Sequence, residues 1–338
     1  MEEDRRVKWV DYAKAIGIFL VVYGHVLRGI NSAGFSPPSE LFALSDKVIY
    51  GFHMPLFFFL SGLFIVKSID KGAGRNLKQK AVTLLIPYFV WSIIQGTVEV
   101  LLSSVSNSTY SFIELTTDVV FNPIGQFWFI YVLFIINAIV YLIYKHISLN
   151  VLLVFSIVLA ITANYVNLWL IDEIMCYSVY FILGVYLSKI NVLKLVQFKM
   201  SNKVSVLLTL LIFIMANYIY FSFIGRLNYG TFGSLILALS GILFIISTSA
   251  YLSTKNLEFL RYIGVNSMII YLVHIIAGSG TRIIIDKFLN YQGYTVHLLF
   301  GVMAGVILPL LTLEVSKHIK LQGVLFGYKT NNQVTQKG

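Results

Sequence analysis

Long apolar segments recur along almost the whole chain, and they constrain its fold more than any other feature. Most are close to the length of about 20 residues that a helix needs to cross a bilayer. Inside a bilayer every backbone N–H and C=O must be paired, and a helix achieves this within one segment. We therefore predict an all-α bundle of about ten transmembrane helices. The expected spans lie near residues 10–27, 48–66, 81–103, 126–144, 150–168, 174–188, 204–223, 232–252, 264–282 and 296–316.

The charges of the chain fit this membrane prediction. Only 12% of residues are charged and 58% are hydrophobic, whereas a soluble domain has about 25% charged residues. Of the 25 Lys and Arg residues, 19 fall in segments on one side of the expected spans and five on the other. The positive-inside rule then places both termini in the cytoplasm. The net charge of +10 is thereby explained as a topology signal, so we expect membrane lipids and no nucleic acid as partners.

Several connecting loops are short, which predicts one transmembrane domain over residues 1–322. The polar residues 323–338 are expected to form a disordered cytoplasmic tail. Cys176 is the one cysteine of the chain, which excludes an internal disulfide and a multi-cysteine metal site. Its apolar surroundings favour a packing thiol over a nucleophile.

The first apolar span carries three ionisable residues on one helical face: Asp11, Lys14 and His25. Lys14 and His25 are eleven residues apart, which is about three helical turns and roughly 16 Å along the axis. Ionisable side chains inside a membrane are costly, so they indicate function. An imidazole takes and returns a proton near neutral pH, which makes His25 a candidate general base.

Further polar residues occur in the second and ninth spans. His53 and Ser61 lie in the second, and Tyr271 and His274 in the ninth. The alternating direction of the spans predicts that two or three of the imidazoles meet in one buried pocket. Helix capping or packing remains the alternative for His53, Ser61 and His274. No histidine or carboxylate spacing typical of a metal site is present, so we expect no metal. The other histidines flank span ends and are expected at the surface: His146, His297 and His318.

Three basic residues precede the third span on the expected cytoplasmic side. Arg75, Lys78 and Lys80 are suited to bind phosphate oxygens. Contacts with lipid headgroups explain the same residues equally well. The sequence leaves both interpretations open.

These residues resemble the motifs of the membrane acyltransferase-3 family of bacterial O-acyltransferases. That family has an Arg or Lys, ten residues and a His in its first span, which Lys14 and His25 match. The match continues in chain order and in part includes the family's Arg-x-x-Arg motif. The matching residues are Phe57, Phe58, Ser61 and Gly62, then Arg75 and Lys78, then Pro87 and Tyr88, and finally Asn266, Ser267, Tyr271 and His274. The compact fucose O-acetylase-like branch is the most similar.

The resemblance implies a multi-pass protein of the bacterial cytoplasmic (inner) membrane with acyltransferase activity. Its donor would be a cytoplasmic acyl-coenzyme A, most often acetyl-CoA. The acceptor would be a hydroxyl of a cell-envelope carbohydrate, either a polysaccharide or a lipid-linked glycan. Coenzyme A phosphates would bind near the inner-side bases: Lys14, Arg75, Lys78 and Lys80.

In this chemistry His25 is expected to act as general base, or to accept the acyl group first and relay it. Asp11 would orient Lys14. The developing oxyanion needs a donor, for which His53, Ser61 and Tyr271 are candidates. The main alternative function is a proton-coupled transporter or flippase of envelope glycan precursors. A membrane receptor or scaffold is a further alternative, although it has no need of the charged face in the first span.

Overall fold

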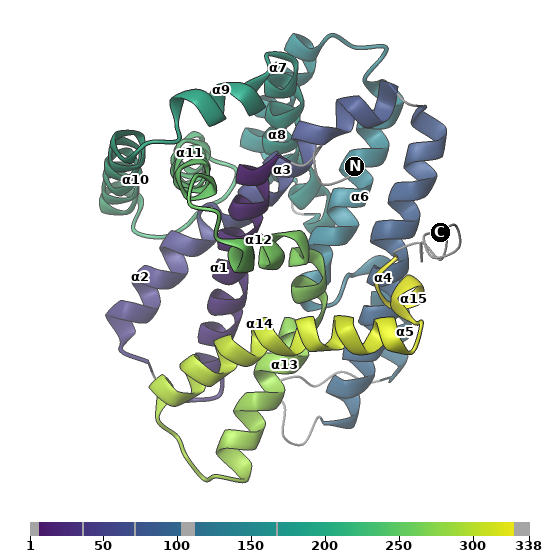
Figure 1. The fold of residues 1–338 in the computed structure, drawn as a ribbon, viewed down its shortest axis with the longest axis vertical. Helices are drawn as coiled ribbons and strands as arrows, with labels where there is room; N and C mark the ends of the chain where they lie inside the picture. Colours follow the sequence, from purple (N-terminus) through teal and green to yellow (C-terminus); the bar gives the residue numbers. More distant parts are fainter. Residues whose placement is uncertain (1–6, 36, 71, 103–111, 167, 328–338) are drawn as a thin grey trace, which may run out of the picture. The chain divides into compact units, whose positions relative to one another are not determined.

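The computed structural model describes residues 7–35, 37–70, 72–102, 112–166 and 168–327. These residues form fifteen α-helices and two short 3₁₀ helices, with no β-strand among them (Figure 1). Within the described chain, nine helical stretches are long and apolar enough to cross a membrane. A tenth, Leu149–Tyr165, is apolar but shorter. The prediction of a helical membrane fold is confirmed, while the side on which each terminus lies stays a prediction.

The chain divides into two compact units. Helices α1 (Lys8–Ser32) and α6 (Trp128–Ile143) are divided between the two units, and α4 (Ala73–Leu101) and α13 (Ser267–Lys287) each have only their first residue in unit 1. The prediction of a single domain over 1–322 therefore stays a prediction. Unit 1 comprises Met1–Gly24, Pro37–Ala73 and Ile135–Ser267, and unit 2 comprises His25–Ser36, Gly74–Phe134 and Met268–Gly338.

Unit 1 is built around a close crossing of two helices. A Cβ atom on Gly62 of α3 (His53–Asp70) would collide with the carbonyl oxygen of Phe181 on α8 (Trp169–Lys189). A Cβ atom on Gly184 of α8 would in turn collide with the carbonyl oxygen of Phe59. Small residues allow membrane helices to approach this closely. The remaining helices of this unit are α2 (Ser39–Tyr50), α3 (His53–Asp70), α7 (Leu149–Thr162), η3 (Ala163–Tyr165), α8 (Trp169–Lys189), α9 (Val192–Lys199), α10 (Lys203–Ile224), α11 (Phe232–Ser253) and α12 (Glu258–Val265).

Unit 2 is held together by aromatic side chains of α4. The Tyr88 hydroxyl donates to the carbonyl of Val119 on α5 at 2.7 Å. The Trp91 indole donates to the carbonyl of Leu325 on α15 at 2.8 Å. The tail predicted for 323–338 thus overlaps an ordered helix, and residues 328–338 lie outside the described part. The remaining elements are α4 (Ala73–Leu101), α5 (Phe112–Phe121), η2 (Gly125–Phe127), α13 (Ser267–Lys287), α14 (Tyr294–His318) and α15 (Gln322–Phe326).

Local sequence signals set several helix ends. The Asn202 side chain accepts from the backbone N–H of Ser205 at 2.9 Å, which caps the start of α10. The same helix ends at Gly225, whose φ of 72° is favourable for glycine. Thr231 and Ser234 form a capping box at the start of α11. Helices α10 and α11 therefore begin and end at defined residues and lie side by side (Figure 1).

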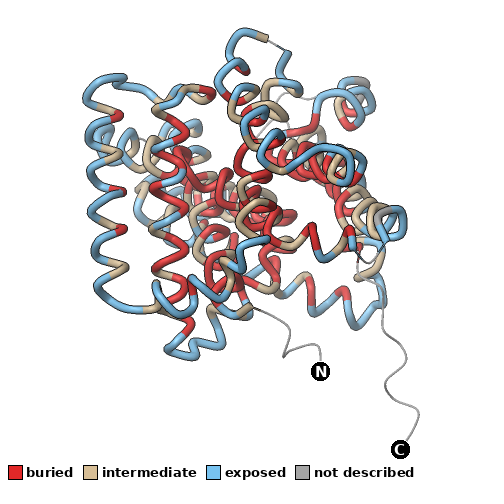
Figure 2. Tube along the Cα trace, turned by 90° about the horizontal axis from the view of Figure 1, so that it is seen from above, coloured by how far each residue is buried: buried red, intermediate tan, exposed pale blue. Residues whose placement is uncertain are grey.

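Exposed apolar residues cover the outer faces of several helices. Individual helices in Figure 2 carry buried residues on one side and exposed residues on the other. On α10 the exposed residues include Leu207, Leu211 and Met215. Such apolar exposure is unusual in a soluble monomer and matches the hydrocarbon core of a bilayer.

Candidate active site

Two of the predicted imidazoles lie together in unit 2. His25 is the first residue that α1 contributes to this unit, and His274 lies on α13. Their ring centroids are 5.2 Å apart, with an angle of 60° between the ring planes. His25 is half-buried, whereas His274 is only 1% exposed. The structure therefore pairs the first-span histidine with the ninth-span histidine.

The hydrogen bonds of His274 indicate which of its nitrogens carries a lone pair. Nδ1 lies 2.7 Å from the carbonyl oxygen of Tyr271 and 3.2 Å from that of Ile270. A carbonyl can only accept, so Nδ1 carries the proton in the neutral ring. Nε2 is then an acceptor, and it is buried with no hydrogen-bond partner among the described residues. This nitrogen is available to a hydroxyl or water that enters the site.

His297 corrects one sequence-based expectation, because it is buried rather than at the surface. Its exposed fraction is 1%, and its ring stacks on Phe35 with centroids 4.3 Å apart. Helix α14 begins at Tyr294, so His297 lies about one turn inside the helix rather than in the preceding loop. Its Nε2 is 2.8 Å from the carbonyl oxygen of Tyr291, which leaves Nδ1 as a buried acceptor with no partner in the described chain. The expectation holds for His146 and His318, which are exposed.

A small cavity of about 20 Å³ connects these side chains. It is lined by His25, His274, His297 and Arg282, together with small and apolar residues of α1 and α13. This volume is sufficient for about one water molecule. Arg282, about two turns after His274 on α13, is only 8% exposed. The cavity thus combines buried acceptors from two imidazoles with the donors of a guanidinium.

A larger cavity of about 240 Å³ adjoins the first. The two share Gly29, Ile275, Ser279 and Arg282 as lining residues. The larger one extends to Gln95 and Glu99 on α4. The histidine site is therefore next to a space with room for part of a substrate.

Tyr271 belongs to a hydrogen-bond network rather than presenting a free hydroxyl. Its hydroxyl donates to the carbonyl of Gln126. The side chains of Gln126 and Gln95 exchange two hydrogen bonds, at 2.7 and 3.2 Å. Gln95 also donates to the Glu99 carboxylate at 2.9 Å. The network joins α13, η2 and α4, so it fixes the polar wall of the larger cavity.

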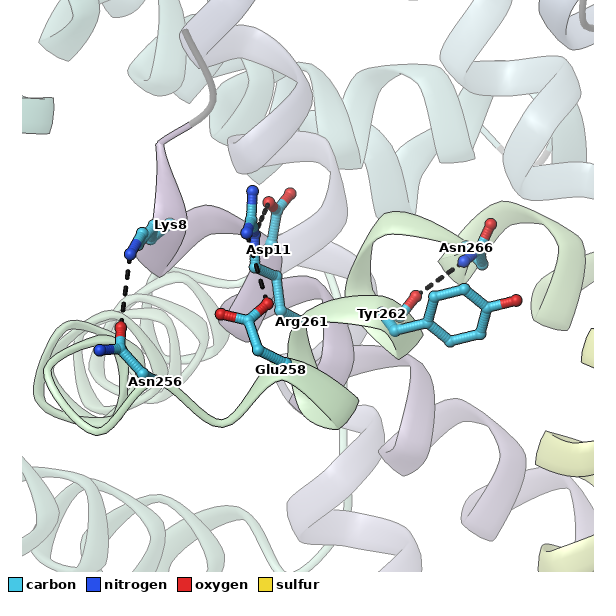
Figure 3. Close-up of polar contacts among 7 residues, drawn as sticks. All are labelled: Lys8, Asp11, Asn256, Glu258, Arg261, Tyr262 and Asn266. Carbon is cyan, nitrogen blue, oxygen red and sulfur yellow. Dashed lines mark hydrogen bonds and ion pairs between the residues drawn. The ribbon is translucent and has the colours of Figure 1, made fainter. Parts of the chain in front are cut away.

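Asp11 lies in unit 1 and pairs with a residue that the sequence did not single out. Its carboxylate is 3.7 Å from the guanidinium of Arg261 on α12, which also contacts Glu258 at 3.4 Å (Figure 3). Asp11 is buried, and Lys14 on the same helix is half-buried. That Asp11 orients Lys14 stays a prediction.

The motif residues of the second span also lie in unit 1. His53 is buried, with Nδ1 2.8 Å from the carbonyl oxygen of Ile49 and its ring against that of Tyr50. Its Nδ1 proton is thereby donated within the protein. Ser61 is half-buried, and its neighbour Gly62 makes the helix crossing described above. Gly62 therefore has a packing function.

The predicted phosphate-binding residues begin α4 in unit 2. Arg75 and Lys78 are exposed and one turn apart, and Lys80 is half-buried. They are accessible to an anion. Across the described ranges, no group of three or more His, Cys, Asp or Glu residues has the arrangement of a metal site.

Five polar residues of these cavities and of the adjoining hydrogen-bond network were not predicted as site residues from the sequence. Two signals were present. Gln95 and Glu99 are polar, four residues apart and inside an apolar span, so they share one helical face. Arg282 follows His274 by about two turns of the same helix. No comparable signal marked the other two, Gln126 and His297.

Comparisons with known proteins address the chain as a whole. A sequence model described as an acyltransferase domain matches residues 7–314. Nodulation protein NolL of Mesorhizobium japonicum is 35% identical over 133 residues, which are 37% of this chain and 32% of that protein. Nodulation protein NolL of Sinorhizobium fredii is 32% identical over 125 residues, which are 36% of this chain and 32% of that protein. The similarity thus spans about a third of the length of these curated relatives, and no solved structure matches.

The family match extends over nearly all of the described residues, including both units and the paired histidines. Together with the nine long apolar helices of the described chain, it shows that this multi-pass membrane protein belongs to the acyltransferase-3 family.

Proposed function

We propose that this protein is an O-acyltransferase of the bacterial inner membrane that moves an acyl group, most simply acetyl, from acyl-coenzyme A to a carbohydrate hydroxyl. The observation that carries the proposal is the pairing of His25 with His274 beside a buried guanidinium. Acyl transfer to a hydroxyl needs a base for its proton and a donor for the oxyanion. The cavity in unit 2 holds groups suited to both tasks.

In the proposed reaction His25 takes the proton of the acceptor hydroxyl as the oxygen attacks the thioester carbonyl carbon. The new C–O bond forms and the C–S bond breaks, and His25 returns the proton to the departing thiolate of coenzyme A. His274 would accept a hydrogen bond at Nε2, either from the His25 ring or from the hydroxyl. Arg282 supplies N–H donors in the same cavity. In a variant of this mechanism, His25 carries the acyl group before the hydroxyl attacks.

Hydrogen bonding distinguishes the candidates for the oxyanion donor. Tyr271 and His53 each donate their proton to a backbone carbonyl. Either would have to break that bond in order to stabilise an oxyanion. The Arg282 guanidinium has five N–H donors and lines the histidine cavity. We therefore assign the oxyanion role to Arg282 in this proposal, and a positioning role to Tyr271.

The donor is proposed to bind through its phosphates to Arg75, Lys78 and Lys80 at the start of α4. A contribution of Lys14 is supported by the motif resemblance alone. Helix α4 carries these three bases in its first turns and Gln95 in its last third. Lys78 and Gln95 are 17 residues apart, which is about 26 Å along the helix axis. An extended molecule such as acyl-coenzyme A has phosphates and a thioester that are far apart, as this spacing requires.

The test uses purified protein in lipid nanodiscs with acetyl-coenzyme A, and it measures release of the coenzyme A thiol. The His25→Ala and Lys14→Ala variants should be folded and inserted, yet release thiol at a small fraction of the wild-type rate. His146→Ala is the matched control, because His146 is an exposed histidine outside both cavities. Acetylation of envelope glycans, measured by mass spectrometry in a deletion strain carrying each variant, should follow the same order.

If the His25→Ala variant transferred the acyl group at the wild-type rate, the proposed role of His25 as the base would be refuted. No thiol release by the wild-type protein, with saturable movement of a glycan precursor across vesicles, would favour the transporter instead.

A further inference from the structure

The larger cavity of unit 2 lies between one face of α4 and one face of α13. On α4 it is lined at positions 95, 98, 99 and 102, and on α13 at 275, 276, 279, 280, 282 and 283. Both sets follow helical spacing, so each helix presents a continuous stripe to the space. Two membrane helices that only packed together would fill such a stripe with small apolar side chains. Here the space is open and partly polar.

The polar lining has a composition suited to hydroxyl groups. Glu99 accepts hydrogen bonds, Arg282 donates them, and Gln95 and Ser279 do both. The one carboxylate and the one guanidinium have opposite charges, so the lining has no net charge that would favour an anionic phosphate. A wholly apolar ligand would leave these groups without partners from the ligand. A ligand with several neutral hydroxyls satisfies donors and acceptors together.

The wall is also fixed before any ligand arrives. Gln95 is tied to Gln126 by two hydrogen bonds, and Gln126 is tied to Tyr271. Gln95 in turn bonds to the Glu99 carboxylate. A preorganised polar wall costs little conformational entropy on binding. This arrangement is typical of a recognition site.

The remaining lining is apolar, and it reaches a partly exposed position. Val98, Leu102, Ile276 and Ile283 contribute aliphatic surface. Leu102 is 41% exposed, so the cavity reaches the surface beyond the end of α4. At its other side the cavity shares Ser279 and Arg282 with the histidine site. A ligand here would extend from a partly exposed apolar edge to the paired imidazoles.

The geometry points to this cavity as the acceptor site, holding one sugar unit by Gln95, Glu99, Ser279 and Arg282 with a hydroxyl directed to the histidines. This inference rests on the proposed acyl transfer and adds the location and chemistry of acceptor recognition. The volume of about 240 Å³ is below the range of roughly 300–1,000 Å³ for pockets of drug-sized ligands. It fits a single sugar unit better than a nucleotide. The sugar belongs either to a glycan chain or to a lipid-linked precursor.

Binding can be measured without any acyl transfer, by protection of an introduced thiol. Cys176 is the one natural cysteine and is buried, so a Cys176→Ala background is suited to single-site labelling. Ser279→Cys in this background places a thiol in the cavity lining. Ile284→Cys is the matched control, because Ile284 lies on the same helix and is 55% exposed away from the cavity lining. Both variants are reconstituted in nanodiscs and labelled with a small methanethiosulfonate.

The probes are octyl and methyl glycosides of a hexose, a deoxyhexose and an N-acetylhexosamine, with octanol as the sugar-free control. At least one glycoside should slow labelling of the Ser279→Cys protein threefold or more, with no change for Ile284→Cys. Protection by the octyl form alone indicates a lipid-linked acceptor, and equal protection by the methyl form indicates a glycan. Protection by octanol equal to that by the glycosides, or by none of the probes, would overturn the assignment.

Two further substitutions test the wall itself. Glu99→Gln should raise the glycoside concentration needed for half-maximal protection at least fivefold, because it removes the charged acceptor. Leu102→Trp should do the same by filling the cavity from its partly exposed side. Full protection in a folded Leu102→Trp protein would also overturn the proposal. Sugar protection of the Ser279→Cys protein, together with no thiol release from acetyl-coenzyme A by the wild-type protein, would separate sugar binding from the proposed enzyme activity.

Discussion

Replacing Tyr271 by Phe distinguishes a catalytic role of this residue from a structural one. The sequence motif suggested that its hydroxyl stabilises the oxyanion, whereas the structure directs that hydroxyl to the carbonyl of Gln126. Tyr271 is 5% exposed, so the carbonyl would lose a buried donor. The expected cost in the free energy of unfolding is about 1–3 kcal/mol.

The two roles predict losses in different observables. Removal of an oxyanion donor slows turnover by about 10²–10³-fold, or roughly 2.7–4 kcal/mol of barrier, without a required loss of stability. Loss of a positioning bond should lower the melting temperature by a few degrees. It should also reduce acceptor-dependent turnover by less than about tenfold, because Gln95 and Glu99 lose part of their support. Hydrolysis of acetyl-coenzyme A in the absence of an acceptor should change even less.

The assay combines thermal unfolding of the purified protein in detergent with thiol release from acetyl-coenzyme A. Tyr218→Phe is the matched control, because Tyr218 is 70% exposed on α10 and should tolerate the loss of its hydroxyl. If turnover instead slows by about two orders of magnitude or more while the melting temperature is unchanged, the positioning role is refuted and Tyr271 is restored as the oxyanion donor.

Three other perturbations have outcomes that follow from single contacts. Gly62→Ala should destabilise the protein by at least about 1–3 kcal/mol in thermal unfolding, because the added methyl meets a backbone carbonyl that cannot move aside. Combined Arg75→Ala and Lys78→Ala should raise the KM for acyl-coenzyme A roughly two- to thirtyfold, from about 0.2–1 kcal/mol per exposed contact, and the effect should shrink in high salt. A double-mutant cycle of Asp11→Asn and Arg261→Gln should show a coupling of at least about 0.5 kcal/mol in unfolding.

Each of these has a control in the chain. Gly74→Ala adds a methyl where no atom lies within 4 Å, so its stability should be unchanged or slightly higher. Lys145→Ala removes an exposed cation outside the proposed phosphate site and should leave the KM for acyl-coenzyme A unchanged. Additive effects of the Asp11 and Arg261 substitutions would mean that the 3.7 Å pair contributes nothing measurable.

Much of the candidate site followed from the motif spacing. His25 and His274 were both singled out, and the structure brings their rings within 5.2 Å. The same reasoning allowed His53 as a third imidazole of the pocket and left capping or packing as its alternative, and the cavity in unit 2 is lined by His297 and Arg282. His53 belongs to unit 1, where its Nδ1 is bonded to the carbonyl of Ile49. Span direction predicts depth in the membrane, but it does not predict which helices are neighbours.

Segment length and apolar content were sufficient to predict membrane-spanning helices, because they set the free energy of moving a helix from water into the bilayer. The sequence also determined the family, because motif order and spacing are properties of the linear chain. The burial of His297, the hydrogen-bond partner of Tyr271 and the pairing of Gln95 with Gln126 depend instead on how the helices pack. The two hydrogen-bonded pairs are 31 and 145 positions apart in the sequence. Helical periodicity identifies which side of a helix is buried, but it does not identify the helix that packs against that side.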